Sequence, residues 1–107
     1  RRSSDLNPAF NTEFFGPVAQ LYLVDSDEEA IQLANATSYG LAGAVYSQDI
    51  AHAQYVAQRM ITGQVFINQP SIGVPQLPFG GVKHSGYGRE MSDLGIYEFA
   101  NQKIIVK

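Results

Sequence analysis

The chain has 107 residues, of which 45% are hydrophobic and 16% are charged, and its formal net charge is -3. This composition is that of an ordinary soluble globular protein, and the length fits a single domain with one core. No apolar run approaches the roughly 20 residues that a membrane helix needs, and the polar stretch at residues 1–5 lacks the apolar core of a signal peptide. We therefore expect a cytoplasmic location and no membrane partner.

The charged residues and the metal-binding residue types exclude further classes of function. Seven basic residues are scattered among ten acidic ones, so no basic surface can neutralise a row of nucleic-acid phosphates. The chain contains no cysteine, which excludes disulfides and thiolate metal ligands, and His52 and His84 lie far apart in the sequence. We expect no nucleic acid and no metal. Any thiol chemistry must come from residues outside this chain.

The first regular elements are a strand and a helix. Residues 18–24 form a short apolar run between a proline and an aspartate, which predicts a strand buried on both faces. A capping box follows, because the Ser26 hydroxyl can accept from the Glu29 amide while the Glu29 carboxylate reaches back. It predicts a helix with one apolar stripe that ends at Gly40.

The same alternation continues through the middle of the chain. Residues 41–46 predict a second strand, residues 47–49 begin a second helix that Gly63 stops, and residues 65–68 predict a third strand. Three strands that alternate with two helices predict a βαβαβ unit with a parallel sheet and right-handed crossovers. The chain is therefore expected to belong to the α/β class.

Regular structure fails after Asn68, where prolines and glycines interrupt any ladder as far as Gly86. A long loop that leaves the carboxyl end of a strand in an open α/β sheet lies where ligands usually bind. Residues 89–100 then predict a C-terminal helix, and residues 103–106 a terminal strand whose free apolar edge would favour self-association. The helix residues expected to face inward are Met91, Leu94 and Phe99.

Two signatures join an aromatic ring to residues with special backbone freedom. They are residues 13–17 (EFFGP) and residues 78–83 (PFGGVK), and the second continues as far as residue 90 (HSGYGRE). Each suits a rigid loop that presents a side chain or its own backbone to a ligand or a partner chain. Lys83 and Arg89 are expected to be surface or interface charges.

Together with residues 7–8 (NP), 38–46 (SYGLAGAVY) and 65–68 (VFIN), these signatures resemble the C-terminal part of the NAD(P)-dependent aldehyde dehydrogenases. Within that family, these motifs are most similar to those of the bacterial succinate-semialdehyde dehydrogenases. The resemblance implies that residues 1–107 are a portion of an α/β catalytic domain, with an oligomerisation tail at about 103–107. It also implies NAD or NADP as cofactor, a small aldehyde as substrate, the remainder of the same enzyme as partner, and a homo-oligomer.

The resemblance implies roles for two residues at the cofactor. In the family's E-x-F-G-P motif, the glutamate hydrogen-bonds the ribose hydroxyls beside the nicotinamide, and the aromatic residue two positions later packs beside the nicotinamide ring. These positions are Glu13 and Phe15. A carboxylate can accept from two vicinal hydroxyls at once, and an aromatic ring gives a flat cofactor an apolar stop. The alternative is a solvated loop acid and an ordinary core ring.

The resemblance also implies a substrate tunnel. The family's specificity segment falls on residues 68–79, with Phe79 as the candidate wall residue or, equally, a core plug that fixes the turn. Related succinate-semialdehyde enzymes hold the substrate carboxylate with a serine in this loop. This chain has Gly73 at that place, with Ser71 nearby but offset.

The implied reaction is oxidation of an aldehyde, with succinate semialdehyde as the candidate substrate. In the family a thiolate adds to the carbonyl, a hydride passes to the nicotinamide, and a glutamate activates the hydrolytic water. Both catalytic residues lie upstream of the matched stretch, so no catalytic residue is assigned here and the chain alone should be inactive. Two alternatives stay open: a self-standing α/β small-ligand-binding or interaction module that uses residues 69–86, and a purely structural domain.

Overall fold

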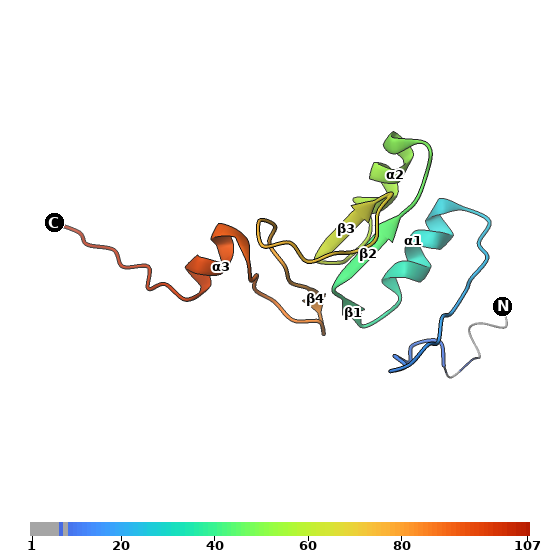
Figure 1. The fold of residues 1–107 in the computed structure, drawn as a ribbon, viewed down its shortest axis with the longest axis horizontal. Coiled ribbons are helices and arrows are strands. Elements are labelled where there is room, and N and C mark those ends of the chain that lie inside the picture. The colour runs from blue at the N-terminus through green and yellow to red at the C-terminus, as the bar shows by residue number, and fades with distance from the viewer. Residues whose placement is uncertain (1–6, 8) are drawn as a thin grey trace.

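The computed structural model describes residues 7 and 9–107; the polar stretch at residues 1–6 and the proline of the Asn7-Pro8 pair lie outside the described residues. In chain order the elements are α1 (Asp27–Asn35), β1 (Tyr39–Gly40), β2 (Ala42–Val45), α2 (Ile50–Ala57), β3 (Gln64–Ile67), β4 (Val82–Lys83) and α3 (Ser92–Glu98). The helices of the described part are all too short or too polar to cross a membrane. Figure 1 shows an α/β body from which the C-terminal segment extends.

The centre of the body is the unit formed by β2, α2 and β3. The two strands pair in parallel, with Ala42 opposite Gln64 and Val45 opposite Ile67. α2 connects them and packs on the ribbon, where Ala53 is fully buried and Phe66 is 9% exposed. The predicted α/β class and the parallel crossover from the second strand to the third are confirmed.

The helix α1 begins as the capping box predicts. The Ser26 hydroxyl accepts from the Glu29 amide at 3.2 Å, and the Glu29 carboxylate accepts from the Asp25 amide at 3.0 Å. Polar contacts join α1 to α2, because His52 Nε2 lies 2.6 Å from Asp27 Oδ2. This pair is exposed, so it contributes little to stability, and the local cap is the stronger reason for the start of the helix.

A second two-stranded ribbon, which the sequence did not predict, attaches residues 78–83 to the body, and we call these residues the Gly-Gly turn. β1 pairs antiparallel with β4, and the Gly63 amide donates to the Gly40 carbonyl at 3.0 Å. A Cβ atom at Gly63 would lie 1.7 Å from the Gly80 carbonyl oxygen, so only glycine lets the turn approach so closely. Gln64 Nε2 also donates to the Pro78 carbonyl at 2.8 Å. The turn is therefore held by direct backbone contact with the start of β3.

Two predicted strands do not form. Residues 18–24 make no ladder in the described part, and Leu21 and Leu23 are 89% and 86% exposed. Residues 103–106 make none either, and Ile104 is equally exposed. A strand forms when its backbone pairs with a neighbour in a ladder, and neither run belongs to a ladder among the described residues. The β-favouring composition of the two runs is a local property of the sequence, whereas a strand forms only when another strand pairs with it.

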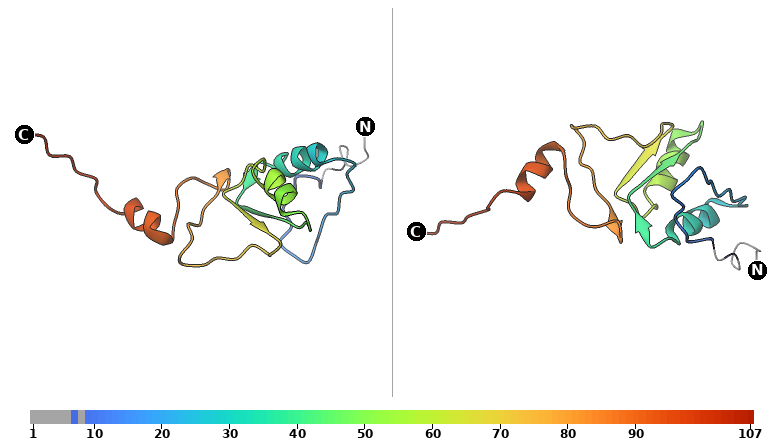
Figure 2. Two further views of the ribbon diagram at one scale, coloured as in Figure 1. Left: turned by 90° about the horizontal axis from the view of Figure 1, so that it is seen from above. Right: turned by 60° about the horizontal axis from the view of Figure 1, so that its bottom comes forward.

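The C-terminal helix α3 is shorter than predicted and continues through Gly95. Its expected inward residues Met91, Leu94 and Phe99 are all exposed, which contradicts that prediction. Both views in Figure 2 show α3 standing apart from the body of helices and strands, which agrees with the exposure of these side chains.

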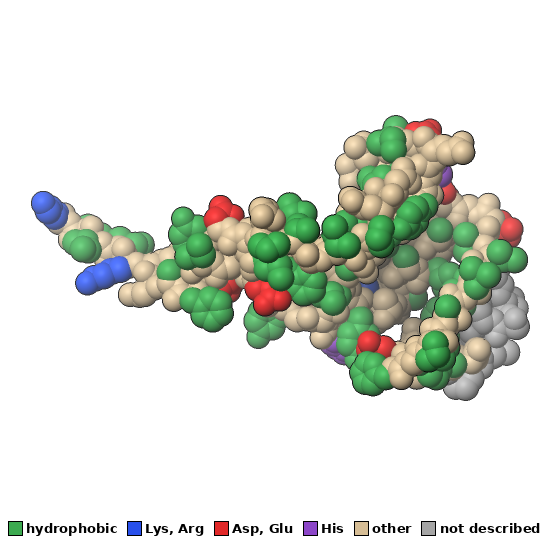
Figure 3. All heavy atoms as spheres, viewed as in Figure 1, with side chains coloured by type: hydrophobic (Ala, Val, Ile, Leu, Met, Phe, Trp, Pro, Cys, Tyr) green, Lys and Arg blue, Asp and Glu red, His purple; other side chains and the backbone are tan. Residues whose placement is uncertain are grey.

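The described structure exposes more surface than a self-contained protein of its mass. Its accessible surface is 8581 Å², whereas an average monomer of 11.7 kDa exposes about 5,900 Å². Its radius of gyration is 17.4 Å, against about 13 Å for a compact domain of this length. Figure 3 shows hydrophobic side chains at the surface along the arm that carries α3. The single core is therefore much smaller than the length predicts.

We expect the purified 107-residue chain to self-associate, because its exposed apolar residues gain free energy when they leave water. Size-exclusion chromatography with light scattering should show a mass that rises with concentration, and a hydrophobic dye should bind. A compact monomer that binds no dye would contradict this expectation.

We expect Gly63→Ala to release the Gly-Gly turn, because the added methyl group collides with the Gly80 carbonyl. Hydrogen exchange measured by mass spectrometry should be faster over residues 78–83. Gly16→Ala is the matched control, since a Cβ atom there meets nothing within 4 Å. Equal exchange in the two variants would show that the close approach does not hold the turn.

Candidate functional site

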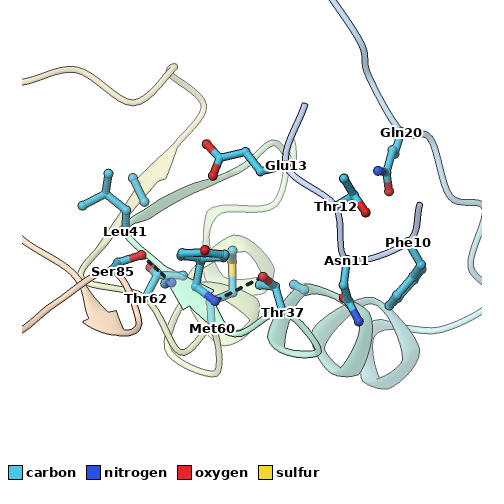
Figure 4. Close-up of a pocket in the computed structure, with 14 residues that line it drawn as sticks. Phe10, Asn11, Thr12, Glu13, Gln20, Thr37, Leu41, Met60, Thr62 and Ser85 are labelled. Carbon is cyan, nitrogen blue, oxygen red and sulfur yellow. Dashed lines mark hydrogen bonds between the residues drawn. The ribbon is translucent and has the colours of Figure 1, made fainter. Parts of the chain in front are cut away.

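A cavity of about 570 Å³ lies beside the amino ends of β2 and β3, and we call it the Glu13 cavity. One wall is the loop from Phe10 to Glu13, and the opposite wall is the segment that joins α1 to β2. Thr62, from the residues before β3, lines it as well. Figure 4 shows these groups converging from segments that are far apart in the sequence. The sequence had instead predicted a ligand site at the carboxyl ends of the strands.

Glu13 and Phe15 occupy different positions at this cavity. Glu13 lines it, and Figure 4 shows its carboxylate projecting from the loop on the side of Leu41. That carboxylate is exposed and makes no ion pair or hydrogen bond with another described residue. Phe15 does not line the cavity, and its ring is 98% exposed. The ring is therefore not a core residue of this structure.

The floor of the Glu13 cavity is held by the residues that follow β4. The Gly40 amide donates to the Ser85 hydroxyl at 3.0 Å, and the His84 amide donates to the Ser38 carbonyl at 3.0 Å. Ser85 itself lines the cavity. Ser85 lies in the motif at residues 78–90, but its role could not be predicted from the sequence, since the contact with Gly40 joins residues 45 positions apart.

Lys83 fixes the opposite wall. Its ammonium donates to the carbonyl of Asn35 at 2.9 Å and to that of Thr37 at 3.0 Å. These carbonyls lie at the C-terminal end of α1, where a positive charge is favourable. Lys83 is exposed, in agreement with the predicted surface or interface charge, and it is also a clamp on the turn that carries Thr37 and Tyr39 into the cavity wall.

The Asn35 side chain extends this clamp to the end of α2. Its Nδ2 donates to the Arg59 carbonyl at 2.8 Å, and its Oδ1 accepts from the Ile61 amide at 2.7 Å. One residue thus joins α1, the segment after α2 and, through Lys83, β4. No local sequence signal marks Asn35, because all three contacts are long-range.

Phe79 lines a second cavity of about 340 Å³. Its amide and carbonyl pair with those of Glu90, each at 2.8 Å, so the turn ends in an antiparallel bridge. Leu41 and Ser85 line both cavities and form the wall between them. Glu13 and Phe79 therefore belong to neighbouring spaces rather than to one.

Arg89 is also a structural cation and not simply the surface or interface charge that was predicted. Its Nη1 donates to the Gly81 carbonyl at 2.9 Å and to the Gly88 carbonyl at 2.7 Å, which ties the glycine-rich loop to itself. Ser71 and Gly73 lie on the exposed loop between β3 and this turn, and they line neither of the two cavities. Among the described residues, no group of three or more histidines and carboxylates could hold a metal ion.

Comparisons with known proteins agree with the resemblance seen in the motifs. The model of the aldehyde dehydrogenase family matches residues 2–105. The succinate-semialdehyde dehydrogenase (NADP+) of Deinococcus radiodurans is 52% identical over 105 residues, which cover 95% of this chain and 22% of that protein.

Solved structures give the same result. Succinic semialdehyde dehydrogenase from Streptococcus pyogenes, in complex with NADP+, matches with a TM-score of 0.90 and 50% identity over 94% of this chain and 22% of that one. Apo betaine aldehyde dehydrogenase from Staphylococcus aureus matches with a TM-score of 0.81 and 47% identity over 83% of this chain and 18% of that one. The chain spans about a fifth of the length of these relatives. It belongs to the aldehyde dehydrogenase family.

Proposed function

We propose that residues 1–107 are the C-terminal part of the catalytic domain of an enzyme that oxidises a small aldehyde to the carboxylic acid with NAD(P). The observation that carries this proposal is the Glu13 carboxylate, which lines a cavity of about 570 Å³ without a described partner. The large exposed surface supports the same view, since further protein would cover it. That surface also disfavours the self-standing binding module.

Glu13 and Phe15 are suited to the nicotinamide half of the coenzyme. The free carboxylate of Glu13 can accept from both hydroxyls of a ribose. The exposed ring of Phe15 can give the nicotinamide an apolar contact once the rest of the enzyme closes the space. NAD(P), when bound, supplies the chemistry of accepting a hydride from the substrate carbon. The relatives that are succinate-semialdehyde dehydrogenases (NADP+) favour NADP.

The loop from Asn68 to Phe79 is suited to the substrate side. Phe79 half-buries its ring in the second cavity, next to the wall that it shares with the Glu13 cavity. Ser71 and Gly73 lie exposed on the same loop, where an aldehyde or the remaining protein could reach them. We propose succinate semialdehyde as the substrate, in line with the names of these relatives.

The groups that break and form bonds are proposed to come from the rest of the enzyme. The chain has no cysteine, so it cannot supply the thiolate that attacks the aldehyde. Glu13 is assigned to binding and not to general-base catalysis. The exposed runs at residues 18–24 and 103–107 are suited to strand pairing with other parts of the enzyme or, for the tail, with another subunit.

We expect the isolated chain to show no aldehyde oxidation, because it lacks the nucleophile. The measurement is the absorbance of NADH or NADPH after purified chain is mixed with succinate semialdehyde and either coenzyme. A turnover above that of a buffer blank, which persists after repurification, would contradict the proposed division of the active site.

We expect Glu13→Gln to weaken coenzyme binding in a completed enzyme. The completed enzyme is a chimera in which residues 1–107 replace the matching segment of the Deinococcus radiodurans relative. Loss of hydrogen bonds to a charged group should raise the KM for the coenzyme about tenfold, while the KM for the aldehyde changes by less than about twofold.

Glu28→Gln is the matched control, because it makes the same chemical change on α1, outside the Glu13 cavity. It should leave both KM values and kcat as they are. If Glu13→Gln also leaves the coenzyme KM and kcat unchanged, Glu13 is a structural or solvated acid and the proposed coenzyme contact is wrong.

A further inference from the structure

Asn68 makes an unusual set of contacts where the chain leaves β3. Its backbone amide donates to the Val45 carbonyl at 2.9 Å, which extends the parallel ladder by one residue. Its side chain then binds both backbone groups of Ser47: Oδ1 accepts from the Ser47 amide at 2.8 Å, and Nδ2 donates to the Ser47 carbonyl at 2.8 Å. One side-chain amide thus replaces the next residue of a strand.

The backbone conformation of Asn68 explains why its side chain, and not a further strand residue, pairs with Ser47. Its φ is 56°, in the left-handed region that asparagine tolerates better than most residues. At this angle the main chain turns out of the ladder and can no longer pair with β2. The side-chain amide therefore closes the carboxyl ends of β2 and β3, while the main chain departs into the loop that follows.

That loop has two further anchors, both on the far side of its exposed part. The Ser92 amide donates to the Pro75 carbonyl at 2.9 Å, and Phe79 pairs with Glu90 through two hydrogen bonds of 2.8 Å. Residues 69–73 lie exposed between these anchors and Asn68. The direction in which this segment leaves the sheet is consequently set by Asn68.

We propose that Asn68 is a positioning residue of the substrate tunnel: its contacts with Ser47 fix the exit angle of residues 69–74 and so the places of Ser71 and Gly73. This inference rests on the proposed function. We assign the action of Asn68 to the loop, because its amide oxygen and its amide nitrogen are each hydrogen-bonded to the Ser47 backbone at the point where the loop begins.

The position of Asn68 predicts whether a substitution there affects the aldehyde or the coenzyme. The Glu13 cavity lies at the amino ends of β2 and β3, whereas Asn68 lies just beyond their carboxyl ends. The parallel ribbon therefore separates the two groups. A change at Asn68 should disturb the aldehyde and leave the coenzyme alone, which is the opposite of the effect expected at Glu13.

The test uses Asn68→Asp and Asn68→Gly in the chimera. Aspartate keeps the shape and tolerates the left-handed backbone, but its carboxylate cannot donate to the Ser47 carbonyl and is repelled by it. Glycine keeps the backbone angle and removes the amide altogether. Gln48→Glu is the matched control, since it adds the same charge beside Ser47 without touching its backbone contacts.

We expect both Asn68 variants to raise the KM for succinate semialdehyde about tenfold, with the coenzyme KM unchanged. The preference for succinate semialdehyde over butyraldehyde, as a ratio of kcat/KM values, should also fall, because the loop no longer holds its place. In Asn68→Gly, hydrogen exchange should become faster over residues 46–48, because the Ser47 amide loses its acceptor, and stay unchanged over residues 42–45. The control should resemble the unsubstituted chimera in each measurement.

Three results would overturn the inference. They are an unchanged aldehyde KM and preference, an equal loss for aldehyde and coenzyme together with a lower melting temperature, and unchanged exchange over residues 46–48 in Asn68→Gly. The last is measured whether or not the chimera is active. Failure of the proposed function looks different: the unsubstituted chimera would fold without oxidising aldehydes, or Glu13→Gln would have no effect on the coenzyme.

Discussion

The close backbone contact between Gly63 and Gly80 determines how the rest of the site is arranged. A side chain at Gly63 would meet the Gly80 carbonyl at 1.7 Å, so the turn can lie on the start of β3 only because no Cβ atom is there. With the turn in place, β4 reaches β1, and Ser85 reaches the Gly40 amide. A contact that involves no side chain therefore sets the positions of several side chains.

The parallel ribbon of β2 and β3 divides the site into two ends with different chemistry. At the amino ends, Lys83 and Ser85 hold a wall and a floor for the cavity into which Glu13 presents its carboxylate. Just beyond the carboxyl ends, Asn68 turns the chain into the exposed loop. The two groups are held by separate hydrogen bonds, so in our proposal coenzyme contact and aldehyde contact can change independently of each other.

The features of the fold that could be predicted from the sequence are those that depend on residues close together in the chain. The capping box of α1 and the strands β2 and β3 formed as predicted, because caps and apolar runs act within a few residues. The pairing of β1 with β4 and the contacts of Lys83 were missed, since they join residues more than 40 positions apart. The Glu13 cavity was missed for the same reason, although Glu13 itself was singled out by its motif.

The predictions that failed carry information of their own. Residues 18–24 and 103–106 have the composition of strands, and Met91, Leu94 and Phe99 have the spacing of a buried helix face, yet all but the half-buried Tyr22 are exposed. The spacing of apolar residues in a sequence reflects the surroundings in which the chain folds. Exposed apolar surface of this extent is unfavourable in water. The chain matches only about a fifth of its relatives' length. In our proposal, the missing neighbours of these residues are therefore other parts of the same enzyme, and the failed predictions mark the surfaces at which those parts bind.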